Sequence, residues 1–334
     1  MKIFNNFSIS NSLKITSNAK YYLEIHNRDD FSELNKFISK KNLPILIIGE
    51  GTNLVLPDLF EGIVVKPIFD HINYDDNQNT VSVGSSVNWD DLVNEMVNNN
   101  IYGYENLSLI PGSVGAAPIQ NIGAYGQEVS KLISSVDCYD YKIGEFIKLT
   151  KDDCDFTYRN SIFKNNTLII YNINFKTDYT NSFNFEYESI KKYISKHKIN
   201  INNIKLKDVS QMITNIRNST LPNPLLIPNV GSFFKNSIIK TNDINTDKFQ
   251  LDQLILWDID SKYVKVGSAR LIELIRHDLQ KYDNVSIYEN HSLVLVTNAK
   301  ATQEEVLNFA ENIKDKVFEV FNISLEIEPT IILN

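Results

Sequence analysis

The sequence predicts an α+β fold built from two or three domains. Its 334 residues exceed what a single domain of roughly 100–200 residues holds. Patterns typical of helices and of strands both occur along the chain, but they do not alternate strictly as in a parallel α/β sheet. Hydrophobic residues make up 43% of the chain and charged residues 22%, which excludes wholesale disorder.

The first 65 residues predict a small α/β unit. Residues 21–25 suit a strand, and Asp30 can cap a helix whose apolar side chains follow the helical period. A short buried strand over 44–48 runs directly into the turn 49–53, which contains two glycines. We expect this turn to need residues without a Cβ atom.

A larger middle unit begins near residue 62. Asn88 can cap an amphipathic helix that starts at Trp89. Residues 178 to about 204 are polar and rich in Asn, Lys and Tyr, which favours an inserted, mobile loop over core structure. Strands are expected at residues 80–83, 134–141, 146–149 and 167–175.

The last unit starts near Asp208, where a helix is expected to run to the residues before Leu221. Thr302 and Glu305 have the spacing of a capping box at the start of a long helix. A further helix is expected over 271–276, and strands over 291–297 and 324–333.

Composition and charge exclude several functions. The net charge is −8 and no block of Lys and Arg stands out, which argues against nucleic-acid binding. Two cysteines and five histidines show no disulfide or metal-ligand spacing, so we expect a reducing compartment and no metal. Without a long apolar stretch or a signal-like N-terminus, we expect a cytoplasmic protein with no membrane contact.

The distribution of glycine points to a ligand. The chain has only 12 glycines, about half the usual share of roughly 7%. Clustered glycines let backbone N–H groups approach an anion, although tight turns alone are the alternative explanation. Neither a Rossmann nor a Walker pattern is present, so a dinucleotide would require another fold. Seven of the glycines fall in three short segments, at positions 49 and 51, at 112, 115, 123 and 126, and at 231.

Five motifs follow one another along the chain. They are Ile-Gly-Glu-Gly-Thr-Asn-Leu at 48–54, the small and neutral segment 110–126, Thr-Tyr-Arg-Asn-Ser-Ile-Phe-Lys at 157–164, Gly-Ser-Phe-Phe-Lys-Asn at 231–236, and Leu-Glu-Ile-Glu at 325–328. In this order they resemble the UDP-N-acetylenolpyruvoylglucosamine reductase family. The resemblance covers nearly the whole chain.

This resemblance implies a two-part FAD-binding domain of the vanillyl-alcohol-oxidase/PCMH type, followed by a C-terminal α+β substrate-binding domain. The implied bounds are 1–66 for the first FAD-binding subdomain, 67–216 with 329–334 for the second, and 217–328 for the substrate-binding domain. The polar segment 178–204 is similar to the substrate-covering loop of the long type (type I) of this family. Tyr187 falls where that type has a tyrosine that closes over the substrate.

The resemblance also implies an activity. Members of this family reduce UDP-N-acetylglucosamine enolpyruvate to UDP-N-acetylmuramate, a peptidoglycan precursor, with bound FAD as cofactor and NADPH as co-substrate. Hydride passes from the flavin to the terminal enolpyruvyl carbon, and a proton is added to the neighbouring carbon. We expect the protein to act as a monomer.

The family's three catalytic roles fall on Arg159, Ser232 and Glu328. Arg159 can grip a carboxylate, and Glu328 can help if it is protonated or hydrogen-bonded in a site of low dielectric constant. Ser232 is the proton donor. Taken singly, these residues are more often an ion pair, a helix cap and an edge charge, so their motifs carry the assignment.

The motifs also assign binding residues. The cofactor-binding residues are Gly49, Glu50, Gly51, Thr52, Asn53, Ile110, Pro111, Gly112, Gly115, Ala116, Ala117, Gln120, Asn121, Gly123, Tyr125, Gly126 and Arg217. The substrate-binding residues are Tyr158, Tyr187, Lys235 and Asn236.

Two departures from the family pattern keep an alternative open. Thr220 stands where the family commonly has Lys, and Thr330 stands where it usually has Arg. Arg270 either supplies a replacement cation or reflects drift. The alternative is a catalytically impaired relative that still binds a nucleotide sugar or flavin. A flavin oxidase with another substrate is a third possibility, disfavoured by the 231–236 motif and the terminal glutamate.

Overall fold

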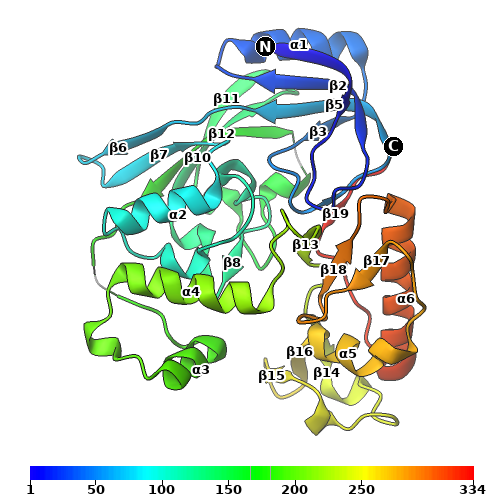
Figure 1. Ribbon diagram of the computed structural model, residues 1–334. Helices are drawn as coiled ribbons and strands as arrows, with labels where there is room; N and C mark the ends of the chain where they lie inside the picture. Colours follow the sequence, from blue (N-terminus) through cyan, green and yellow to red (C-terminus); the bar gives the residue numbers. More distant parts are fainter. Residues whose placement is uncertain (166, 181) are drawn as a thin grey trace. The chain divides into compact units, whose positions relative to one another are not determined.

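The computed structural model describes residues 1–165, 167–180 and 182–334, and these form two compact units. The first unit comprises residues 1–7, 19–50 and 61–219, and the second comprises 8–18, 51–60 and 220–334. Figure 1 shows helices and strands in both units, so the predicted α+β class is confirmed. The finer division into three domains stays a prediction. No helix in the described ranges is long and apolar enough to cross a membrane.

The first unit contains a five-stranded sheet in the order β11-β10-β12-β7-β6 (Figure 1). Every neighbouring pair in it is antiparallel. Four of the strands were predicted to within about two residues, and β6 was missed. The strands are β6 (Ile72–Asp75), β7 (Thr80–Gly84), β10 (Ile133–Asp140), β11 (Glu145–Thr150) and β12 (Leu168–Lys176).

A second sheet has the order β1-β2-β5-β3 and packs against helix α1 (Asp30–Lys41). The prediction that Asp30 caps this helix is wrong by one position. Asp29 is the N-cap residue, while the Asp30 carboxylate binds the Met1 amino group at 2.5 Å and the His26 N–H at 2.8 Å. The strands are β1 (Lys2–Ser8), β2 (Asn18–Ile25), β3 (Ile45–Ile47) and β5 (Leu59–Pro67).

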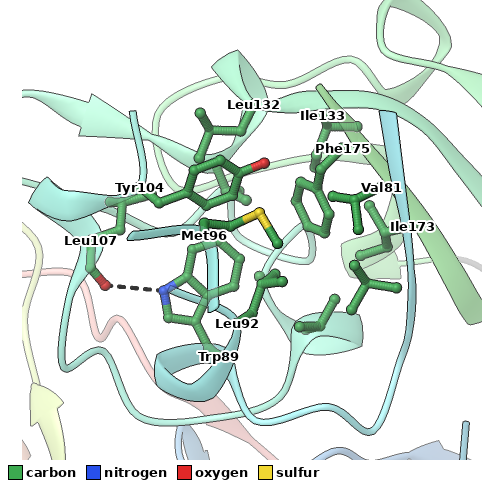
Figure 2. Packing of buried hydrophobic residues seen from close by; sticks show 14 of the residues in the cluster. Val81, Trp89, Leu92, Met96, Tyr104, Leu107, Leu132, Ile133, Ile173 and Phe175 are labelled. Carbon is green, nitrogen blue, oxygen red and sulfur yellow. Dashed lines mark hydrogen bonds between the residues drawn. The ribbon is translucent and has the colours of Figure 1, made fainter. Parts of the chain in front are cut away.

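Helix α2 (Trp89–Asn98) packs its apolar side against the five-stranded sheet. Asn88 caps it as predicted, because its side chain accepts the N–H groups of Asp90 and Asp91 at 2.9 and 3.2 Å. Figure 2 shows Trp89 deep in this core, with its indole Nε1 donating to the Leu107 carbonyl at 3.0 Å. This bond ties the start of α2 to the segment that leads to the second glycine cluster.

The segment 178–204 is not simply a loop, which corrects the sequence-based expectation. It contains helix α3 (Glu188–His197), which packs on helix α4 (Leu206–Thr220) through the fully buried Ile190. Tyr193 and Ile194 follow Ile190 at helical spacing, but the intervening lysines and the flanking serines lower the mean hydropathy and hide this stripe. Asn181, in the same segment, lies outside the described residues.

The second unit combines two three-stranded sheets with helices α5 (Ser268–Ile275) and α6 (Gln303–Phe321). Helix α6 buries the predicted apolar positions 306, 309, 313, 317 and 320. The sheets have the orders β13-β18-β17 and β14-β16-β15. Their strands are β13 (Asn229–Ser232), β14 (Ser237–Lys240), β15 (Leu256–Asp258), β16 (Tyr263–Val266), β17 (Val285–Ile287) and β18 (Val294–Thr297).

Two predicted features of the second unit are incomplete. Thr302 accepts the Glu305 N–H at 3.2 Å, but the Glu305 carboxylate binds Asn284 rather than completing a capping box. The expected strand 324–333 is reduced to β19 (Thr330–Ile331), which pairs in parallel with β4 (Leu54–Val55). Pro329 directly before β19 has no N–H to offer a ladder.

Candidate active site

The first two predicted cofactor-binding turns come together in the first unit. The turn at Gly49 follows β3, and a Cβ atom on Gly49 would lie 2.4 Å from the Ser113 hydroxyl. Contacts this short do not occur between real side-chain atoms, so the close approach of the two segments relies on the missing side chain. Glu50 beside it pairs with Lys66 at 3.0 Å.

The second glycine segment is hydrogen-bonded to the loop between β7 and α2. Val114 N–H donates to the Val87 carbonyl at 2.8 Å, and Gly115 N–H donates to the Ser85 carbonyl at 2.9 Å. These bonds fix the short 3-10 helix Val114–Ala116, which lies in the middle of the segment. The predicted residues Ile110, Pro111, Ala116, Ala117, Gln120, Gly123 and Gly126 lie along the same stretch.

Backbone donors in this segment fit a phosphate-bearing cofactor. Gly112 and Ser113 are buried, yet in the described part of the chain their N–H groups have no hydrogen-bond acceptor. The N–H groups of Gly49 and Glu50, described in the same unit, also have no acceptor there. Because buried N–H groups are nearly always paired in folded proteins, the donors of Gly112 and Ser113 are available to an anionic group of a ligand.

In the second unit, Gly51, Thr52 and Asn53 continue the first turn. Ser12 N–H donates to the Gly51 carbonyl at 3.1 Å, and Thr330 N–H donates to the Asn53 carbonyl at 3.0 Å. Gly51 has a φ of +65°. These bonds engage carbonyl oxygens only, and among the described residues the N–H groups of 51–53 also have no acceptor.

Asn121 serves the fold through its side chain. Its amide donates to Glu128 at 3.1 Å and to the Thr157 carbonyl at 3.2 Å, and its oxygen accepts the Ser130 N–H at 3.1 Å. Because both amide protons and the backbone N–H are engaged, the latter by the Pro118 carbonyl at 3.1 Å, any contact of Asn121 with a cofactor would go through an oxygen atom.

Arg159 lies at the tip of a tight turn, where Thr157 and Asn160 exchange backbone hydrogen bonds. Its guanidinium donates to the Gly123 carbonyl at 2.9 Å and lies 5.1 Å from the centre of the Tyr158 ring. The φ of Arg159 is +53°, which is uncommon for a residue with a side chain. The predicted catalytic arginine therefore lies against the second glycine segment.

Tyr125 contacts two other predicted site residues, Arg217 and Tyr187. Its hydroxyl hydrogen-bonds Arg217 of α4, and its ring meets the ring of Tyr187 edge-on at 5.4 Å. Burial lowers the pKa of Arg217, although Tyr125 and the charge of Asp90 act to raise it. Burial also raises the pKa of Tyr125. The hydroxyl is therefore neutral near pH 7 and donates or accepts a hydrogen bond without carrying charge.

The second unit brings Glu328 next to the segment that contains Ser232. The Phe233 carbonyl accepts the Glu328 N–H at 2.9 Å, and the Glu326 carbonyl accepts the Lys235 N–H at 2.9 Å. Residues 233–235 and 326–328 thus form a short antiparallel ladder around the Phe234–Ile327 bridge. Ser232 stands one residue before this ladder and Glu328 stands at its end.

The predicted polar contacts near this ladder already have partners in the protein. Lys235 pairs with Glu326, and the Asn236 side chain accepts the Ser268 N–H at 3.1 Å. Arg270 pairs with Glu273 at 2.9 Å and donates to the Gln253 carbonyl at 3.0 Å. A ligand contact by any of these side chains would share or replace such a bond.

Sequence reasoning missed residues outside the glycine segments that hydrogen-bond to the backbone of the predicted site. Asp90 accepts the Leu109 N–H, and the buried Ser85 accepts the Gly115 N–H through its carbonyl. In the sequence Asp90 looks like an ordinary acidic residue in the first turn of a helix, and no pattern marks its link to Leu109.

Comparisons with known proteins match nearly the whole chain. A profile described as "FAD binding domain" matches residues 19–150, and one described as "UDP-N-acetylenolpyruvoylglucosamine reductase, C-terminal domain" matches residues 223–332. The UDP-N-acetylenolpyruvoylglucosamine reductase of Flavobacterium johnsoniae is 33% identical, over 99% of this chain and 100% of that protein. Its counterpart in Bdellovibrio bacteriovorus is 35% identical, over 96% of each chain.

A solved structure shares the fold. The crystal structure of UDP-N-acetylenolpyruvylglucosamine reductase (MurB) from Thermus caldophilus superposes with a TM-score of 0.66 at 17% identity, covering 99% of this chain and 98% of that one. Together with the profile matches, this defines an FAD-dependent oxidoreductase, and FAD as the predicted cofactor is confirmed. The chain belongs to the UDP-N-acetylenolpyruvoylglucosamine reductase family.

Proposed function

We propose that this protein reduces UDP-N-acetylglucosamine enolpyruvate to UDP-N-acetylmuramate with electrons from NADPH, in the synthesis of peptidoglycan precursors. The observation that carries the proposal is the short ladder in which Glu328 lies opposite Phe233, the residue that directly follows Ser232. Two motifs far apart in the sequence meet there, and each holds one residue with a role in the reaction. The partner is a nucleotide sugar, and we expect catalysis by a cytoplasmic monomer.

The proposed reaction has three requirements: a hydride, stabilisation of negative charge, and a proton. FAD, when bound, supplies the hydride that it receives from NADPH. An enol ether is a poor hydride acceptor, so the site has to stabilise negative charge on the substrate carboxylate as it becomes an enolate. Finally, a proton has to reach the carbon next to the one that accepts the hydride.

Arg159, Glu328 and Ser232 meet these needs in our proposal. Arg159 is cationic at every relevant pH and can hold the carboxylate with two parallel hydrogen bonds. Glu328 assists in stabilising the enolate. Ser232 donates the proton, which a weakly acidic hydroxyl can do when the acceptor is a strongly basic enolate carbon.

The cofactor residues have a matching role. The N–H groups of Gly49, Glu50, Gly112 and Ser113, which have no acceptor among the described residues, support a site for the phosphate groups of FAD. Tyr125 and Arg217 form a hydrogen-bonded pair, to which Tyr187 adds an aromatic contact. We propose that Tyr187 covers the substrate from this position, and that Tyr158, Lys235 and Asn236 contact it.

The visible spectrum tests the proposal. The purified protein should be yellow, its absorbance should bleach when NADPH is added without oxygen, and the colour should return when the enolpyruvyl substrate is added. A colourless protein that binds no added FAD would refute the proposal. Bleaching without recovery would instead favour the alternative of a catalytically impaired relative, which the residues Thr220 and Thr330 suggested. Arg270 pairs with Glu273, so in that case it does not serve as a replacement cation.

A further inference from the structure

The first turn of helix α2 is hydrogen-bonded at three points to residues 107–112, which lead into the second glycine segment. Trp89 Nε1 donates to the Leu107 carbonyl at 3.0 Å (Figure 2), and Trp89 N–H donates to the Gly112 carbonyl at 2.9 Å. Between these two bonds, the Asp90 carboxylate accepts the Leu109 N–H. The path of the chain from Leu107 to Gly112 is therefore set by two consecutive residues of α2.

Leu109 is held in an unfavourable backbone conformation. Its φ of +60° lies in the left-handed region, which costs a residue with a side chain about 1–2 kcal/mol. Such conformations persist only where surrounding contacts impose them. The bond from Leu109 N–H to Asp90 is charge-assisted and thus stronger than a neutral hydrogen bond, so it is suited to impose this one.

The conformation of Leu109 affects the residues that come after it in the chain. Gly112 and Ser113, three and four residues later, carry the buried N–H groups that have no acceptor among the described residues. The direction of these groups depends on the path of the chain between Leu109 and Gly112. A change at Leu109 would therefore alter the path of the chain toward these donors even if no residue of the segment itself were altered.

Helix α4 also contacts the residues that lead into the second glycine segment. Ser210 on α4 hydrogen-bonds Ser108 at 2.9 Å, directly before Leu109. Arg217 follows Ser210 by seven residues and thus lies on nearly the same face of the helix. The charge of Asp90 acts on Arg217, whose pKa it raises against the effect of burial.

We propose that Asp90 is a positioning residue of the cofactor site. Its carboxylate holds Leu109 in the left-handed conformation, and this keeps the N–H groups of Gly112 and Ser113 available to an anionic group of FAD. The inference rests on the proposed function only in that FAD is the ligand of this segment. The competing explanation is that Asp90 merely stabilises the start of α2, as acidic residues in a first helical turn commonly do.

Asp91 offers a matched control, because it is the next residue of the same first turn and is exposed. The test compares holoenzymes of the full chain carrying Asp90→Ala, Asp90→Asn and Asp91→Asn. Each is diluted stepwise, and the fluorescence of released FAD gives its dissociation constant. We expect release to rise roughly tenfold for Asp90→Ala, because a hydrogen bond to a charged group is lost. We expect Asp90→Asn, whose side-chain oxygen still accepts the bond, and Asp91→Asn to stay within about threefold of wild type.

Two results would overturn the inference. One is an Asp90→Ala holoenzyme that holds FAD as tightly as wild type, and the other is Asp90→Asn failing as badly as Asp90→Ala. A wild-type protein that binds no FAD would refute the proposed function itself, so the two failures are distinguishable. Should Asp90→Ala not fold, Asp90→Glu keeps the charge in the first turn but moves the carboxylate by one methylene. It should raise release at least about threefold, and wild-type retention by this variant would count against the inference.

Discussion

The carbonyl oxygen of Phe233 accepts the backbone N–H of Glu328 at 2.9 Å. This bond belongs to a ladder of main-chain contacts that also joins Lys235 to Glu326. Backbone pairing thus places Glu328 next to the Ser232 segment. Side chains of both residues can then be changed while the register is kept, which makes their roles separable by mutation.

The first prediction concerns Ser232. Ser232→Ala removes the proposed proton donor but no backbone contact, so NADPH should still bleach the flavin. Reoxidation by the enolpyruvyl substrate should slow by about 10²–10⁴-fold, the range typical of a lost general acid. Stopped-flow absorbance at the flavin band measures both half-reactions separately.

Ser237→Ala is the matched control, because Ser237 lies in the same unit and its hydroxyl bonds the Ser324 carbonyl at 2.8 Å. This variant loses a serine hydroxyl and a hydrogen bond but should keep both half-reactions near wild-type rates. An unchanged second half-reaction in Ser232→Ala would remove Ser232 from its proposed role.

The second prediction concerns Gly51, which combines a φ of +65° with a close neighbour. A Cβ atom on Gly51 would lie 2.5 Å from the Ser10 carbonyl oxygen, which is backbone and cannot simply rotate away. Gly51→Ala should therefore lower the thermal midpoint by several degrees and reduce the flavin content of the purified protein.

Gly144→Ala separates steric conflict from conformational strain. Gly144 has a comparable φ of +77°, but its nearest neighbour is the side-chain amide of Asn35, which can move. We expect Gly144→Ala to cost about 1–2 kcal/mol from strain alone and to leave the flavin content unchanged. Equal losses in the two variants would show that the contact with Ser10 is unimportant.

Sequence patterns predicted the parts of the fold where one signal dominates. Helix α2 was located with its cap, because Asn88 precedes a regular apolar stripe. The strands β7, β10 and β12 were found because their buried faces alternate or run continuously. That the two glycine segments contact a ligand stays a prediction, which rests on the scarcity of glycine elsewhere in the chain.

Features that depend on distant partners escaped the same reasoning. Asp30 was expected to cap α1, but its carboxylate binds the amino group of Met1 instead. Glu305 was expected to close a capping box, but its carboxylate instead accepts two hydrogen bonds from Asn284, one from the backbone N–H and one from the side-chain amide. The roles of Leu109 and Arg159 as left-handed residues are invisible in the sequence, because neither residue type favours that conformation.

The third prediction concerns Ile190, which anchors α3 on α4 and is fully buried. Ile190→Ala should cost about 2–5 kcal/mol of local stability, the range for truncating a buried isoleucine. Because Tyr187 directly precedes α3, loosening this helix should raise KM for the nucleotide sugar more than it lowers the rate of flavin reduction by NADPH.

Ile201→Ala is the control in the same segment, since Ile201 is 48% exposed. Its truncation should change neither stability nor KM by a measurable amount. Hydrogen exchange at the amides of 188–197 should speed up in Ile190→Ala only. Equal exchange in both variants would mean that Ile190 does not hold α3.

The fourth prediction is a pH dependence from His291. Burial lowers the pKa of His291 from its ordinary value of 6.5, and its Nδ1 accepts the Leu293 N–H at 3.3 Å. The unfolded chain therefore binds more protons than the folded one below about pH 6.5, and stability falls as the pH drops through this window. Above it, the contribution is fully present.

The comparison of two glutamine variants isolates this effect. His291→Gln should flatten the fall in thermal midpoint between about pH 6.5 and pH 5. His277→Gln should leave the slope as in wild type, since His277 is exposed. A slope that survives in His291→Gln would assign the pH dependence to other groups.

The last prediction concerns Arg159, whose φ of +53° places a proposed catalytic side chain on a strained backbone. Both Arg159→Gly and Arg159→Ala remove the guanidinium, so turnover should fall at least about 100-fold in each, as when a charge-stabilising donor is lost. They should differ in stability. Glycine relieves the left-handed strain and alanine does not, so Arg159→Gly should be the more stable by about 1 kcal/mol. At Ser195, exposed within helix α3, the order should reverse, with the alanine variant more stable by about 0.8–1 kcal/mol. Thermal unfolding of the four variants measures both differences. The same order at both positions would mean that Arg159 is not strained and that the turn holding it forms without cost.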